Sequence, residues 1–176
     1  MGTLRKEVAM TVRIVGIVGA AIGCLLVVSG CSFFGGTQDE YTYWEPALSP
    51  DETTLVNESE GESSLELYTL DLDTNVEQQL TTNEYADWSP DWSPDGSRIA
   101  FASSRDDNVD LYVLMVATGE VVRVTTHAAD DINPHWGEDG LIYFNSNRSE
   151  SWEIFTIDPD TLTLRKVTSI EASATP

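Results

Sequence analysis

The feature that most constrains this chain is an internal repeat with a step of 44 residues. The motif Pro90-Asp91-Trp92-Ser93-Pro94-Asp95-Gly96 lies 44 residues after Pro46-Ala47-Leu48-Ser49-Pro50-Asp51 and 44 residues before Pro134-His135-Trp136-Gly137-Glu138-Asp139-Gly140. Residues 67–70 and 111–114 keep this step, as do residues 80–82 and 124–126. Their third counterparts, 154–157 and 167–169, follow after 43 residues, because one residue is deleted between Gly140 and Ile142. A fixed period of this length indicates repeated structural units that bury their cores against one another. We therefore predict three units within residues 41–168, at about 41–84, 85–128 and 129–168.

Each unit is expected to consist of β-strands. In the second unit, residues 99–103, 110–116 and 121–125 have strand composition, and a fourth, short strand is expected around Pro90–Trp92 or Pro134–Trp136. Residues 93–96 place Ser, Pro and Gly where a type I turn prefers them. The run 111–116 does not alternate polar and apolar residues, which predicts a strand buried on both faces. No convincing helical period follows residue 31.

A four-stranded sheet covered on both faces, repeated at this period, is typical of a propeller blade. The predicted fold class is all-β: a partial β-propeller of three four-stranded antiparallel blades, preceded by an N-terminal signal or anchor helix. An open stack of three sheets and a plain β-sandwich are the alternatives, and neither explains the repeat as well.

Residues 90–125 resemble the repeat of TolB-like β-propellers. The resemblance rests on Pro-x-Trp-Ser-Pro-Asp-Gly-Ser-x-Ile-Ala-Phe-x-Ser-x-Arg, followed by Leu-Tyr-Val and Val-Thr, and it extends over roughly residues 41–168. In the first unit, Leu48 replaces the Trp, Glu52 the Gly and Gly61 the Arg. The residues that define the repeat are Pro46, Pro50, Asp51, Pro90, Trp92, Pro94, Asp95, Gly96, Arg105, Pro134, Trp136, Asp139, Gly140 and Arg148. The resemblance implies the fold and leaves the task open, because one fold serves many functions.

The number of units departs from that family, whose propellers usually have six or more blades. Three blades cannot close a ring, and open edges of buried-type strands favour association. A homodimer that completes a six-bladed ring, an uncapped half-propeller and a truncated descendant of a longer protein are the alternatives. We expect an open arc of three blades in the monomer.

The N-terminus predicts export. Residues 1–13 contain Arg5, Lys6 and Arg13, and the run Val12–Val28 is almost wholly apolar and ends in Val28-Ser29-Gly30-Cys31. A basic segment, an apolar segment and small residues before a cleavage point are typical of a secretory signal. The closing tetrad resembles the lipobox of bacterial lipoproteins, which implies cleavage before Cys31 and a lipid on its sulfur. An uncleaved membrane helix, a cut before Cys24 and a start at Met10 remain alternatives.

The negative charge of the chain argues against two classes of partner, nucleic acid and anionic lipid. Of 30 Asp and Glu and nine Lys and Arg, only Glu7 and three basic residues precede Cys31, so the rest of the chain carries a net charge of −23. Such a body is not expected to bind nucleic acid or anionic lipid, which leaves the lipid on Cys31 as its membrane contact. The acidity fits either a high-salt habitat or an ordinary acidic surface.

Residues 31–40 are predicted to be a lipidated Cys and flexible tether, and residues 169–176 a tail.

The residues of an enzyme are mostly missing. There is no Gly-x-Ser-x-Gly, no Gly-rich phosphate loop and no zinc-like cluster of Cys and His, and the acidic pairs fit turns better than a calcium loop. His127 and His135 are expected in exposed loops. We predict no catalytic residue, no metal and no cofactor.

Three side chains are candidates for a recognition surface: Trp88, His135 and Trp152. Trp88 and Trp152 lie off the repeat pattern, while Trp92 and Trp136 keep it and are expected in the core. Arg105 and Arg148 are expected either to line a pore for anions or to form fixed ion pairs with acids such as Asp106 or Asp110.

The function expected from the sequence is that of a lipid-anchored, extracytoplasmic, non-catalytic module for protein–protein interaction at the cell envelope. Its partners would be the membrane, through Cys31, and another envelope protein. The alternative is an accessory subunit of a hydrolase or a glycan-binding module.

Overall fold

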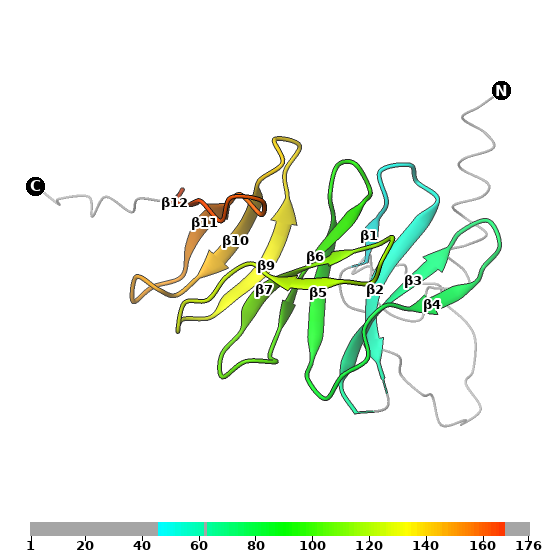
Figure 1. Cartoon of the computed structure of the whole chain (residues 1–176), viewed down its shortest axis with the longest axis horizontal. Helices are drawn as coiled ribbons and strands as arrows, with labels where there is room; N and C mark the ends of the chain where they lie inside the picture. The colour runs from blue at the N-terminus through cyan, green and yellow to red at the C-terminus, as the bar shows by residue number, and fades with distance from the viewer. Residues whose placement is uncertain (1–45, 62, 168–176) are drawn as a thin grey trace, which may run out of the picture.

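The chain forms three separate four-stranded antiparallel sheets, which lie side by side along the molecule (Figure 1). The computed structural model describes residues 46–61 and 63–167. Each sheet is a meander in which neighbours in sequence are neighbours in space. The strands are β1 (Ala47–Leu48), β2 (Thr54–Glu60), β3 (Leu65–Asp71) and β4 (Glu77–Gln79) in sheet 1; β5 (Asp87–Trp92), β6 (Arg98–Ser103), β7 (Asp110–Met115) and β8 (Val121–Arg123) in sheet 2; and β9 (Asp131–Trp136), β10 (Ile142–Ser146), β11 (Glu153–Ile157) and β12 (Leu164–Lys166) in sheet 3.

These sheets confirm the predicted all-β architecture of three four-stranded antiparallel units. The four strands expected in the second unit are all present, and their bounds differ from the expected ones by one to three residues. The predicted signal or anchor helix, the lipidated Cys31, the tether and the tail lie outside the described residues.

The first strand of sheets 2 and 3 contains a β-bulge. Ser89 and Asn133, 44 residues apart, both have positive φ, and the strand pairing shifts register at both places. Each is followed by a proline, Pro90 or Pro134. Proline removes a donor from the strand ladder and is tolerated at edge strands and bulges. The repeat motif therefore encodes an edge strand that bends at a fixed point.

The turn after this strand has the geometry that its residues predict. The Gly96 amide donates to the Ser93 carbonyl at 2.9 Å, and the Ser93 hydroxyl donates to Asp95 at 2.7 Å. Gly96 has φ of +69°, a conformation that glycine adopts without steric cost. In sheet 1 the equivalent residue is Glu52, which takes φ of +60° despite its side chain.

Sheet 2 is buried on both faces, as the run 111–116 predicts. Leu111 and Val113 belong to a buried cluster shared with sheet 3, whereas Tyr112 and Leu114 belong to a cluster shared with sheet 1. Alternate residues of one strand thus serve two different cores. These two interfaces hold the three sheets together.

Each interface pairs small residues with large ones. Between sheets 2 and 3, Ala100 and Ala102 face a cluster that includes Trp136 and Phe144. Between sheets 1 and 2, Val56 shares a cluster with Trp92 and Phe101. At these register positions the larger residue belongs to the sheet that comes later in the chain. Large-against-small packing of this kind fills an interior without voids.

Candidate recognition site at one end of the sheets

Two arginines are locked at the end of the second strand in sheets 2 and 3. The Arg105 Nη2 donates to both carboxylate oxygens of Asp87, at 2.8 and 2.9 Å, and its Nε donates to the Ser103 hydroxyl at 2.9 Å. Its guanidinium lies over the Tyr112 ring, 4.5 Å from the centroid. Asp87 has no exposed surface. A buried carboxylate needs such a partner, because an uncompensated charge in the interior is strongly destabilising.

Arg148 repeats this arrangement in sheet 3. It donates to both oxygens of Asp131, at 2.7 and 2.8 Å, and to the Ser146 hydroxyl at 2.8 Å. Its guanidinium lies 4.9 Å from the centroid of Phe155. Asp131 is fully buried, as Asp87 is. The fixed ion pair predicted for these arginines is therefore present in both sheets.

The acid partners differ from those expected. Asp106 and Asp110 were the expected acids, but Asp87 and Asp131 hold the two arginines. The reason is topological: Asp87 begins β5 and Ser103 ends the antiparallel neighbour β6, so they meet at the same end of the sheet. Asp106 and Asp110 instead bind another arginine, Arg123.

Arg123 organises a second polar network at this end of sheet 2. It contacts Asp110 at 2.5 Å and Asp106 at 3.1 Å, and Asp106 also accepts a hydrogen bond from the Tyr112 hydroxyl. Burial raises the pKa of Asp110, which is opposed by its hydrogen bonds from Arg123 and Thr125. Burial and the neighbouring Asp106 raise the pKa of Tyr112. Tyr112 therefore remains a neutral donor, and the arginine charge is neutralised within the network.

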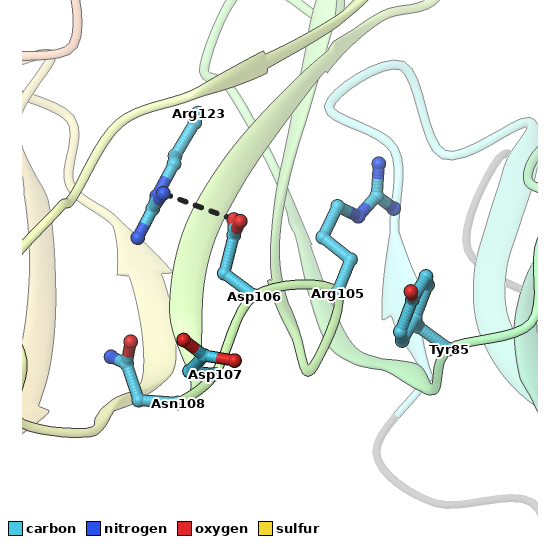
Figure 2. Close-up of a pocket in the computed structure, with 6 residues that line it drawn as sticks. All are labelled: Tyr85, Arg105, Asp106, Asp107, Asn108 and Arg123. Carbon is cyan, nitrogen blue, oxygen red and sulfur yellow. Dashed lines mark ion pairs between the residues drawn. The ribbon is translucent and has the colours of Figure 1, made fainter.

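Between these two networks lies a hollow of about 320 Å³, shown in Figure 2. It is lined by Tyr85, Arg105, Asp106, Asp107, Asn108 and Arg123. These residues come from the link between sheets 1 and 2, from the β6–β7 loop and from the end of β8. The ion pair between Arg123 and Asp106 forms one wall, and Arg105 lies beside Tyr85 on the other (Figure 2).

Two groups of this hollow remain available to a partner. Tyr85 is 47% exposed, and Asp107 is exposed with no hydrogen bond or ion pair to any described residue. Asn108 is fixed, because its amide donates to the carbonyls of His127 and Ala129 at 2.9 and 2.8 Å. An aromatic ring and a free acid on a pre-ordered polar frame suit recognition of a partner surface.

The three predicted recognition residues do not form one surface. Trp88 is half-buried and packs against the cluster between sheets 2 and 3. His135 is exposed, but it lies in strand β9 rather than in the expected loop, and its Nδ1 is 2.8 Å from Asp91. Trp152 is 50% exposed and precedes β11, at the opposite end of sheet 3 from His135. Of the three, Trp152 alone offers a large exposed apolar side chain.

Sequence reasoning missed the residues that build this end of the sheets, although the repeat contains their signal. Asp87 and Asp131 are 44 residues apart, like the prolines and tryptophans. Asp110 and Glu153 are 43 apart, as are Arg123 and Lys166, and the Lys166–Glu153 pair at 2.6 Å repeats the Arg123–Asp110 pair. Reading the charged positions in repeat register would have paired them.

Residues 46–61 and 63–167 contain no group of three or more His, Cys, Asp and Glu arranged to hold a metal ion. No helix in the same ranges has the length and apolar character needed to cross a membrane.

Known proteins share the architecture of this chain. The family model described as "TolB beta propeller domain" matches residues 37–176. No curated protein sequence matches the chain. Among solved structures, the putative TolB from Agrobacterium tumefaciens superimposes with a TM-score of 0.65 at 26% identity, covering 70% of this chain and 48% of that one.

Two further structures share the fold. TolB from Acinetobacter baumannii gives a TM-score of 0.66 at 24% identity, covering 74% of this chain and 33% of that one. An oligogalacturonate lyase from Vibrio parahaemolyticus gives 0.57 at 16% identity, covering 74% and 42%. The chain thus spans half or less of the length of these structures. Its three sheets match blades of TolB-type propellers.

Proposed function

The chain belongs to the TolB beta propeller family, and on that premise we propose that it is a membrane-anchored, extracytoplasmic lipoprotein that acts as a non-catalytic protein-interaction module at the cell envelope. The observation that carries the interaction role is the hollow at the end of sheet 2. Its two arginines are paired with Asp87 and Asp106, and it offers outward the Tyr85 ring and the Asp107 carboxylate, which is unpaired among the described residues.

The anchoring half of the proposal is supported by the sequence alone. Val28-Ser29-Gly30-Cys31 follows an apolar run and a basic start, as in bacterial lipoproteins. The acidic body, with few Lys or Arg, has no electrostatic attraction to anionic lipid, so stable attachment requires the lipid. At least two acyl chains are needed for a stable anchor.

Membrane fractionation of cysteine variants tests the anchor. Cys31→Ser should lose the lipid and shift the protein from the membrane fraction to the soluble fraction or the medium. Cys24→Ser is the matched control and should stay in the membrane fraction. Unchanged membrane retention and unchanged mass of Cys31→Ser would contradict lipidation at this residue.

Affinity capture from membranes tests the interaction role. The wild-type chain should recover a protein in stoichiometric amount, and the double variant Tyr85→Ala with Asp107→Ala should lose it. The control variant Val122→Ser, whose side chain is also exposed, should keep it. Recovery of polysaccharide in place of protein would replace the proposal with the glycan-binding alternative, and recovery of a hydrolase would identify the accessory-subunit role.

A further inference from the structure

Sheets 1 and 3 each have one face that neither buried cluster uses. Sheet 3 contributes Phe144, Phe155 and Ile157 to its cluster with sheet 2, so the alternate residues of the same strands point away from it. On that outer face Ile154 is 39% exposed and Val167 is 52% exposed. On the outer face of sheet 1, Leu48 is 47% exposed.

The repeat register shows what each outer face would present to another sheet. In sheets 1 and 2 the position facing the next sheet holds Val56 and Ala100, and in sheet 3 it holds Tyr143. The position that faces the preceding sheet holds Trp92 and Trp136 in sheets 2 and 3, and it holds Leu48 in sheet 1.

At a second position of the repeat, residue size differs between the sheets in the same way. Phe101 and Phe144 face the preceding sheet in sheets 2 and 3, whereas sheet 1 has Asn57 at this register. Both internal interfaces put a small residue against Trp and Phe. The two outer faces put a large residue, Tyr143, opposite Leu48 and Asn57, which are smaller than the Trp and Phe at the same register, so the sizes complement each other in the reverse sense.

We propose that these two faces pack on each other between two copies of the chain, with sheet 3 of one copy against sheet 1 of the other. A closed pair related by a two-fold axis contains this contact twice and leaves neither face open. The inference rests on the interaction role proposed above and names a second copy as the partner at the outer faces.

Charge predicts how the pair responds to salt. The chain from Cys31 onward has a net charge of −23, so two copies repel each other at low ionic strength. Salt screens this repulsion, with a Debye length of about 10 Å at 0.1 M and about 3 Å at 1 M. The exposed side chains named on the two faces, Leu48, Ile154 and Val167, are apolar, so the dimer should strengthen as salt rises.

Sedimentation equilibrium of the full chain in density-matched detergent tests the proposal. We expect a dimer whose fraction increases between 0.1 and 1 M NaCl. Ile154→Arg should raise its dissociation constant about tenfold or more, because it places a charge in an apolar contact. Val122→Arg is the matched control: Val122 is 42% exposed on β8 of sheet 2, and its substitution should leave the dimer unchanged.

Mixing two variants tests which faces meet. Chains with Ile154→Arg and chains with Leu48→Glu should each be monomeric, but their mixture should form a dimer, because one of its two contacts joins Arg with Glu and the other is wild-type. A strictly monomeric wild-type chain, a ladder of trimers and larger species, or equal loss with Val122→Arg would overturn the proposal. A monomer that still captures its envelope partner would overturn this inference alone and leave the proposed function standing.

Discussion

At the residue scale, the buried ion pairs are the most sensitive points of the molecule. Asp87 and Asp131 are fully buried, and each has one arginine that supplies both charge and hydrogen bonds. Such a pair adds little stability relative to an apolar replacement, but removal of one partner leaves the other as an uncompensated buried charge. The arginines therefore act as locks between the first and second strands.

Removal of the arginine should reveal this dependence. Arg105→Ala leaves the buried Asp87 carboxylate without a cation, with the Asn83 amide still donating to it at 2.8 Å, and should lower the free energy of unfolding by about 3 kcal/mol, measured by urea denaturation. Arg165→Ala, an exposed arginine on β12, is the control and should change it by less than about 0.5 kcal/mol. Equal effects of the two substitutions would show that the Arg105 pair is dispensable.

Two substitutions at the same turn position should change the stability of the protein in opposite directions. Gly96 and Glu52 occupy the same repeat position with φ of +69° and +60°. Gly96→Ala should destabilise the protein by about 1–2 kcal/mol, because a side chain is strained in this conformation. Glu52→Gly should relieve that strain and stabilise it by about 0.5–1 kcal/mol after the entropic cost of glycine. Thermal unfolding measures the stability of both variants. A loss of stability in Glu52→Gly would contradict the predicted strain at Glu52.

Asp95 predicts an acid-sensitive contribution to stability. Hydrogen bonds from the Ser93 hydroxyl and from the Ser97 amide and hydroxyl lower the pKa of Asp95 to about 2. A carboxyl whose pKa is lower in the folded state stabilises the fold above its unfolded pKa of 3.8, and this contribution is lost as pH falls toward 2. The stability difference between wild type and Asp95→Asn should therefore shrink from pH 6 to pH 2.5 in urea denaturation. A difference that stays constant over this range would refute the assignment.

At the element scale, the strands divide into a protected centre and open edges. In β6 and β7 nearly every residue is buried, whereas all residues of β4 and β12 are exposed. Hydrogen exchange reports such differences, because buried ladders open only with larger unfolding events. The amides of β6 and β7 should exchange slowest among the described strands, and those of β4 and β12 fastest. Uniform protection across the sheets would contradict the packing.

The strands and their faces were predictable because they depend on local pattern. The apolar run 111–116 revealed two buried faces, and the order Ser93, Pro94, Gly96 revealed the turn. Contacts that depend on strand pairing were not predictable in the same way. Asp87 lies 18 residues before Arg105, while the incorrectly expected Asp106 is adjacent to it in sequence.

Side-chain exposure was also beyond local pattern. Trp88 lies off the strict repeat, yet the pleat of β5 directs it toward the core between sheets 2 and 3. His135 lies two residues after the bulge at Asn133, in strand β9 and not in the exposed loop that was expected for it. Which face of a bulged strand meets solvent is decided by neighbouring sheets, and the sequence of one strand does not contain that information.

At the scale of the whole molecule, the described chain is a row of three sheets joined by two cores (Figure 1). Sheet 2 is covered on both sides, and sheets 1 and 3 each use one face for the cores. This arrangement leaves the outer faces and the hollow near Tyr85 as the surfaces through which a tethered protein would act. Tethering restricts such a module to partners at the same membrane.

The intact mass of the chain purified from its membrane tests the central claim, a lipid-tethered interaction module, most directly. We predict a mass that begins at Cys31 and includes a diacylglyceryl group and at least one further acyl chain. A mass that begins at Met1 or Met10, or one that begins at residue 31 without lipid, would contradict it.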